Sequence, residues 1–258
     1  MKFVSRHPIL VSVLLLAAIL LALILGGALW MRYESESHDY WYSIVITTPA
    51  VLENCTFILP VPFTNNRSIL GEAMVRGEVY NLPPDWRLSL EQVNSTPMLK
   101  IIAPEIVPEY HGYPIPIEWG STPSLTPPPA ATAWSEETPV LISLQVGISQ
   151  RVPESIDTQN PINREPLLSY PELYVPNPCR GPFPAGKCYR YMAPVFMHCS
   201  PTGIHNATLS IASGGSNQWW VLGWSGNSYD ETIEVTPMED QAGWVMGDGF
   251  LSTGVGRY

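Results

Sequence analysis

The chain has 258 residues, with 13 lysines and arginines against 23 aspartates and glutamates, and a formal net charge of −10. Because phosphate groups bind to basic surfaces, this balance excludes nucleic acid as an expected partner and disfavours direct contact with anionic headgroups. The 27 prolines are about twice the ordinary usage, so long helices are not expected in most of the chain.

The N-terminal segment 8–31 is apolar and carries no charge. As a helix it would be about 36 Å long, enough to cross a hydrocarbon core of about 30 Å. We therefore predict a transmembrane helix of the signal-anchor type. Residues 1–7 form a cytoplasmic tail, because Lys2 and Arg6 follow the positive-inside bias. The alternative is a signal peptide cleaved after Ala28, where a pattern of small residues ends.

Beyond the membrane segment we expect a short acidic stalk, 32–39, and an external domain, 40–258. Trp30 and Tyr33 lie where an interfacial aromatic belt is expected. Removing the two basic residues of the tail leaves 11 lysines and arginines against 23 acids, a charge of −12 for the external part. This acidic surface indicates solubility rather than a binding site.

The sequence of the external part predicts an all-β, β-sandwich-like domain. Runs rich in β-branched and aromatic residues predict strands at 40–47, 52–59, 73–82, 86–93, 98–103, 140–149, 189–199 and 242–251. Two long proline-rich loops, at about 108–139 and 153–188, interrupt this pattern, because proline withholds the amide donor that a sheet needs.

Four cysteines in an external domain predict two disulfides. Cys179 and Cys188 are separated by only eight residues, a loop that a disulfide closes easily. Strand alternation turns Cys55 and Cys199 inward, so of the three connectivities we favour this pairing, with the second bridge joining two strands or two sheets. The alternative is a Cys/His metal site that uses His198, although the paired C-x2-C spacing of such sites is missing.

Four Asn-x-Ser/Thr sequons predict glycosylation, at Asn54, Asn66, Asn94 and Asn206. Alternation in the strand 52–59 places Asn54 on the outward face. Asn94 begins the predicted turn, 94–97, of a hairpin between the strands 86–93 and 98–103. These positions agree with an external location.

The segment 206–235 is predicted to be a meander with two-residue turns at Gly214-Gly215 and Gly226-Asn227. This register places Leu209 opposite Trp220 and forms a core face that also includes Gln218 and Glu231. Its apolar members are Ala207, Leu209, Ile211, Trp220, Leu222, Trp224, Tyr229 and Ile233. The polar face holds Asn206 and Trp219. Cover from a neighbouring loop would explain Trp219, and the functional alternative is an aromatic platform for a sugar or a partner protein.

No catalytic motif is present. Gly223-Trp224-Ser225-Gly226-Asn227 lacks the final glycine of a hydrolase elbow, and phosphate loops, H-E-x-x-H helices and EF-hands are missing. The remaining candidates are scattered: His111, His198, His205, Asp157, Asp230, Asp248 and Glu239. We predict no catalytic residues, metal or cofactor. An extracellular hydrolase built from distant carboxylates, around Ca²⁺ or as a glycosidase pair, is the third alternative.

Two segments, NPINREPLL (160–168) and WWVLGWSGNSY (219–229), resemble uncharacterised membrane-anchored exported proteins of methanogenic archaea. The resemblance covers most of the external part and implies the same topology and an archaeal surface location. It implies no functional residue, because that group has no established activity. We expect a non-enzymatic single-pass membrane protein that acts in cell-surface protein–protein contact or envelope organisation. A carbohydrate-binding module that uses Trp219 is the alternative.

Overall fold

A computed structural model describes residues 8–111, 140–179, 186–200, 207–236 and 242–254. The helices are α1 (Pro8–Ser35), α2 (Ile69–Val75) and the 3-10 helix η1 (Pro171–Leu173). The strands are β1 (Ser37–Thr47), β2 (Leu52–Pro60), β3 (Arg87–Val93), β4 (Thr96–Ile106), β5 (Glu109–His111), β6 (Val140–Ile142), β7 (Leu144–Val152), β8 (Val175–Asn177), β9 (Cys188–His198), β10 (Thr208–Trp220), β11 (Trp224–Val235) and β12 (Gly243–Ser252). The prediction of an all-β domain after one apolar helix is confirmed.

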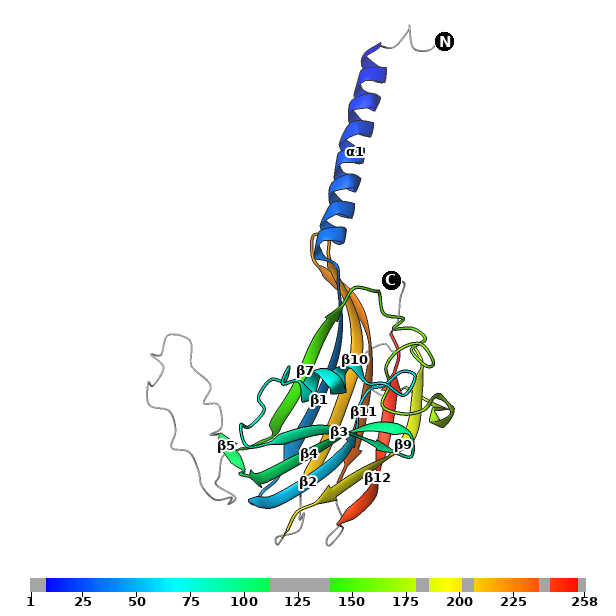
Figure 1. Ribbon diagram of the computed structural model, residues 1–258. Coiled ribbons are helices and arrows are strands. Elements are labelled where there is room, and N and C mark those ends of the chain that lie inside the picture. The colour runs from blue at the N-terminus through cyan, green and yellow to red at the C-terminus, as the bar shows by residue number, and fades with distance from the viewer. Residues whose placement is uncertain (1–7, 112–139, 180–185, 201–206, 237–241, 255–258) are drawn as a thin grey trace, which may run out of the picture.

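Helix α1 projects away from the β domain (Figure 1). Its stretch 11–35 is long and apolar enough to cross a membrane, and none of these residues is buried. The helix continues past the predicted end at Met31 to Ser35, and β1 begins at Ser37. The predicted stalk 32–39 therefore does not form: the last turn of the helix leads directly into the sheet.

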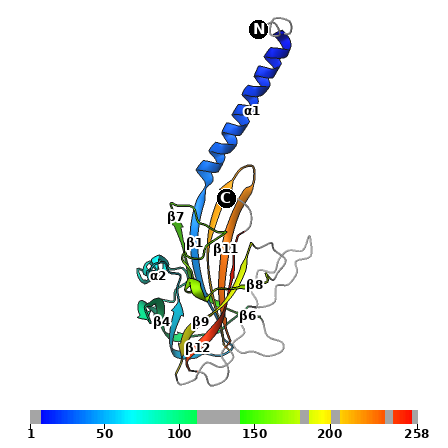
Figure 2. The ribbon, with the colours of Figure 1, turned by 90° about the vertical axis from the view of Figure 1, so that its right-hand side faces the viewer.

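Ten strands form one curled antiparallel sheet. Its order is β3-β4-β2-β9-β12-β11-β10-β1-β7, and β8 pairs with β9 outside this path. The ladder between β2 and β9 has only three pairs, from Thr56 opposite His198 to Ile58 opposite Phe196. Around this short ladder the two halves of the sheet turn toward each other, so that β2, β3 and β4 cross β1, β10 and β11 (Figures 1 and 2). The predicted sandwich is thus made by one sheet.

The core lies between the two halves of the sheet. Its fully buried side chains include Phe57 and Leu59 of β2, Ile101 of β4, and Tyr42 and Ile44 of β1. Burial of each such apolar side chain contributes about 1.5–3 kcal/mol. The buried Tyr42 hydroxyl donates a hydrogen bond of 2.8 Å to the carbonyl of Pro60, which ties β1 to β2.

Between the edge strands β3 and β7 lies α2, where a strand at 73–82 was predicted. That prediction is wrong. Ser68 caps the helix by accepting a hydrogen bond of 3.0 Å from the amide of Gly71. One helix face is buried and consists of Leu70, Gly71, Ala73 and Met74. After the helix, Tyr80 exchanges two backbone hydrogen bonds with Gly147 of β7, which covers that edge of the sheet.

Both proline-rich loops contain short regular pieces where they are described. In the first, β5 lies inside the predicted bounds and pairs with β6, which directly follows them, and residues 112–139 lie outside the described residues. The second contains η1 and β8. The β3–β4 hairpin is confirmed, with a turn that is tighter than predicted. Only Asn94 and Ser95 form it, with positive φ angles of 51° and 67°.

Both favoured disulfides are present, Cys55–Cys199 and Cys179–Cys188. Cys55 and Cys199 adjoin the short β2–β9 ladder, so their bridge joins neighbouring strands of one sheet rather than two sheets. As predicted, the side chains that share the inward face of β9 with Cys199 are buried: Tyr191, Val195 and Met197. Because all four sulfurs are paired, the alternative of a Cys/His metal site is wrong.

The β10–β11 hairpin differs from the predicted meander. Strand β10 passes through Gly214 and Gly215 without turning, and the chain reverses only at 221–223. Leu209 therefore pairs with Val235 and not with Trp220. Of the predicted core face, Ala207, Leu209, Ile211, Tyr229 and Ile233 are buried, whereas Trp220, Leu222 and Trp224 are exposed.

The glycine pair serves packing rather than turning. A Cβ on Gly214 would lie 2.4 Å from the carbonyl oxygen of Tyr229 and 2.8 Å from the indole nitrogen of Trp41. A Cβ on Gly215 would lie 2.7 Å from the ring of Tyr229. Aromatic rings of neighbouring strands thus occupy the space that side chains would need, and glycine inside a strand marks such close approach.

We expect Gly214→Ala to lower the free energy of unfolding by about 1–3 kcal/mol, because the added methyl group meets backbone and a packed indole. Gly223→Ala is the control, since a Cβ there meets nothing within 4 Å, and its effect should stay within about 0.5 kcal/mol. Urea denaturation of the two variants measures the difference. Equal effects at the two positions would contradict the packing role.

Candidate functional site

The tip of the β10–β11 hairpin meets the end of α1, at residues far apart in the sequence. The amide of Trp220 donates a hydrogen bond of 2.8 Å to the hydroxyl of Ser35, the last helical residue. That hydroxyl lies 2.6 Å from the carbonyl oxygen of Met31, to which it donates. Ser35 therefore both ends the helix and fixes the hairpin beside it.

The predicted binding residue Trp219 is half-buried at this junction. The guanidinium carbon of Arg32, in the last turn of α1, lies 5.0 Å from the centroid of its ring. This is the geometry of a cation–π contact. The cover expected for Trp219 thus comes from the helix rather than from a loop. One ring face is occupied by Arg32, which disfavours the stacking of a sugar there.

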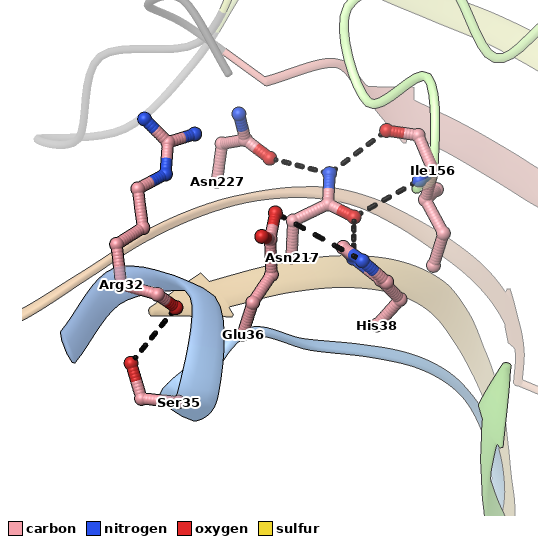
Figure 3. Close-up of polar contacts among 7 residues, drawn as sticks. All are labelled: Arg32, Ser35, Glu36, His38, Ile156, Asn217 and Asn227. Atoms are coloured by element: carbon pink, nitrogen blue, oxygen red, sulfur yellow. Dashed lines mark hydrogen bonds and ion pairs between the residues drawn. The ribbon is translucent and has the colours of Figure 1, made fainter. Parts of the chain in front are cut away.

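A polar row below the junction crosses three strands, with His38 opposite Asn217 and Asn217 opposite Asn227. The buried Asn217 oxygen accepts hydrogen bonds from the amide of Ile156, at 2.9 Å, and from Nδ1 of His38, at 2.8 Å. Its amide nitrogen donates to Ile156 and Asn227 (Figure 3). The hydrogen bond from the Ile156 amide identifies the Asn217 atom that it reaches as the oxygen, which can only accept. Because Nδ1 of His38 faces the same oxygen, Nδ1 must be the donor and carries a proton. Nε2 of His38 lies 4.0 Å from Glu36.

Sequence reasoning did not find this row. The segment that contains Glu36 and His38 was interpreted as a stalk, and its partner Asn217 lies 179 residues away from His38. No motif connects them, because the contact exists only once β1 and β10 pair. The arrangement ties the start of β1, directly after α1, to β10, β11 and the segment at Ile156.

A second polar cluster lies inside the domain, around Glu231 of β11. Its carboxylate is fully buried and accepts hydrogen bonds from the amide of Leu168, at 2.8 Å, and from the Tyr174 hydroxyl. Burial raises the pKa of Glu231 to about 7, against the opposing effect of these hydrogen bonds. The neighbouring Tyr229 hydroxyl donates to the carbonyl of Pro166 at 2.8 Å. Together these bonds fasten the second proline-rich loop to the sheet.

An apolar strip lies on the outer face of β9 and β12. Trp244 is 49% exposed and Met246 is 56% exposed, and the Trp244 and Phe196 rings are 5.5 Å apart. A groove of about 690 Å³ runs along the strip, and its lining also includes Glu234 and Asp248. These two carboxylates are cross-strand partners, a proximity that the sequence did not reveal. The groove therefore combines exposed apolar side chains with two carboxylates, of which Asp248 lies 3.5 Å from the guanidinium of Arg190.

Three of the predicted glycosylation residues, Asn54, Asn66 and Asn94, are exposed. As predicted, Asn54 points away from the core while Cys55 beside it is buried. The fourth, Asn206, lies outside the described residues. Glycosylation itself stays a prediction.

In the described part of the chain, no group of three or more histidine, cysteine, aspartate or glutamate residues could hold a metal ion. Asp157 forms an ion pair with Arg164, and Asp230 accepts a hydrogen bond from Ser228. His205 and Glu239 lie outside the described residues. Among the described residues, the structure does not gather these candidates; Asp248 has a carboxylate as its cross-strand neighbour, but this is Glu234, which was not a candidate.

Comparisons with protein family models, with curated proteins and with solved structures found no match to this chain. The proposed function therefore rests on the sequence and the structure of this chain.

Proposed function

We propose that this chain is a non-enzymatic, single-pass membrane protein whose β domain lies outside the cell and binds a neighbouring protein at the cell surface. The anchor is α1, and its direct junction with β1 holds the domain at the membrane. Of the three alternatives weighed from the sequence, this is the one that the exposed surfaces favour.

The external location is supported by the cysteines and the charges. Disulfides form and persist in oxidising compartments, and all four cysteines are paired. The basic residues Lys2 and Arg6 precede the apolar helix, which favours a cytoplasmic N-terminus. Exposed sequons at Asn54, Asn66 and Asn94 agree with glycosylation of the domain.

The apolar strip on β9 and β12 is the observation that carries the proposed contact. Tryptophan and methionine are enriched in protein interfaces, and an exposed apolar strip with a polar rim is typical of such surfaces. Because Glu234 and Asp248 line the groove, we expect a partner that presents apolar side chains flanked by lysine or arginine.

Chemical cross-linking of the full chain in intact membranes tests this function. We expect one reproducible protein neighbour, and we expect Trp244→Ala combined with Met246→Ala to remove it, since both side chains are exposed and their loss leaves the core intact. Leu173→Ala is the matched control, because Leu173 is 48% exposed but lies in η1, outside the strip. Monomer alone at several cross-linker lengths would contradict the proposal.

A further inference from the structure

The tip of the β10–β11 hairpin is apolar and uncharged, in contrast to the acidic domain that carries it. Leu222 is 84% exposed, Trp224 is 71% exposed and Trp220 is 36% exposed. Every residue from Asn206 to Tyr229 is uncharged. Large apolar side chains gathered at an exposed tip are unfavourable in water, so this surface calls for an apolar environment.

The stability of the folded domain does not explain why a leucine occupies position 222 at the tip. Its φ of 56° lies in the left-handed region, which favours glycine or asparagine, while Gly223 beside it does not use that region. The leucine side chain is also almost fully exposed, so it gains little from packing. Both its backbone and its exposure cost stability in the isolated domain. A leucine at this position is explained if its side chain has a partner outside the protein.

The position of the tip identifies that partner. Both ribbon views show the hairpin ending beside the last turn of α1 (Figures 1 and 2). Trp220 is held at Ser35, and Leu222 follows two residues later in the turn 221–223 that ends the hairpin. The helix from Ser35 back to Met31 covers only about 6 Å. The contacts of Trp220 with Ser35 and of Trp219 with Arg32 thus place the hairpin tip at the end of α1, within one to two turns of the point where the apolar segment of the helix ends.

We propose that Trp220, Leu222 and Trp224 insert into the interface of the bilayer that α1 spans, as a second membrane attachment of the β domain. The inference rests on the proposed function insofar as α1 must be the anchor. Indole rings have an apolar body and a polar N–H, which suits them to the headgroup region, and Trp30 and Tyr33 are exposed in the last two turns of α1. Arg32, stacked on Trp219, places a cation where lipid phosphates lie.

The two attachments have a mechanical consequence. A domain held only through one helix can tilt toward or away from the bilayer, whereas a helix and an inserted hairpin together fix its tilt and its height above the bilayer. The uncharged tip is also the part of the acidic domain that approaches anionic headgroups with the least repulsion. The apolar strip on β9 and β12 would then lie at a defined height and angle to the bilayer.

Fluorescence quenching in phosphatidylcholine vesicles tests the insertion with the full chain. Since all four native cysteines are in disulfides, Leu222→Cys provides a single thiol for an environment-sensitive dye. Lipids that carry a nitroxide just below the headgroup should quench this dye strongly, and the apolar surroundings of the inserted dye should shift its emission to the blue. Trp224→Cys should give the same result. A dye at Leu173→Cys, the matched exposed leucine, should be quenched by aqueous iodide instead.

The outcomes separate insertion from anchoring. Protein that does not float with the vesicles would show that α1 fails as an anchor, and would overturn the proposed function together with the insertion. Protein that floats while the Leu222→Cys dye is quenched by iodide as strongly as the control would overturn the insertion alone. A dye shielded from both quenchers would reveal a contact with protein and would also overturn it.

Discussion

Removal of the Cys55–Cys199 bridge, by Cys55→Ala with Cys199→Ala, should lower the free energy of unfolding by about 5 kcal/mol. The bridge closes a loop with a sequence separation of 144, and in the chain-entropy account the stabilisation grows with the length of the closed loop. It also clamps the three-pair ladder between β2 and β9, on which the connection between the two halves of the sheet depends. Denaturation in guanidinium, followed by tryptophan fluorescence, measures the loss.

The second disulfide provides the matched control. Cys179 and Cys188 have a sequence separation of 9, which corresponds to about 2.5 kcal/mol in the same account. Their alanine variant should therefore lose about half as much stability and keep the pairing of β2 with β9. A larger loss of stability on removing Cys179–Cys188 than on removing Cys55–Cys199 would contradict this account. It would show that the entropy of the unfolded chain does not determine the stabilisation by these disulfides.

Features that depend on local alternation were predictable from the sequence. Inward Cys55 with outward Asn54, and the inward face of β9, follow from the period of two in a strand. The disulfide pairing followed from them. The curl of the sheet did not follow, because it depends on which distant strands pair, and the short β2–β9 ladder has no sequence signal.

The hairpin tip shows why one pattern can mislead. Two glycines in sequence serve equally as a turn or as a space for neighbouring rings, and only the positions of Trp41 and Tyr229 decide between these uses. The wrong choice placed Trp220, Leu222 and Trp224 in the core. Their true exposure beside α1 is the basis of the proposed membrane contact, so the error fell on a candidate functional surface.

Glu231→Gln should remove a pH dependence of stability that the wild type shows between about pH 4.5 and pH 7. The folded-state pKa of Glu231 is about 7, raised by burial from an ordinary value of 4.5. In this window the folded protein binds a proton that the unfolded chain has released, so wild-type stability falls as pH rises. Below pH 4.5 both states are protonated and the penalty vanishes. The difference between the folded and unfolded pKa values corresponds to a loss of about 3 kcal/mol in the free energy of unfolding across this window.

The glutamine variant mimics the protonated carboxyl group at every pH. Relative to the wild type, its free energy of unfolding should therefore rise by about 3 kcal/mol between pH 4.5 and pH 8. The hydroxyls of Tyr174, Tyr191 and Tyr229 face the same site, and burial raises their pKa values above the window, so they do not titrate in it. Glu234→Gln, at an exposed position of the same strand, is the control and should change stability little. A parallel pH course for wild type and Glu231→Gln would mean that the buried carboxylate is ionised throughout, and that its hydrogen bonds to Leu168 and Tyr174 outweigh its burial.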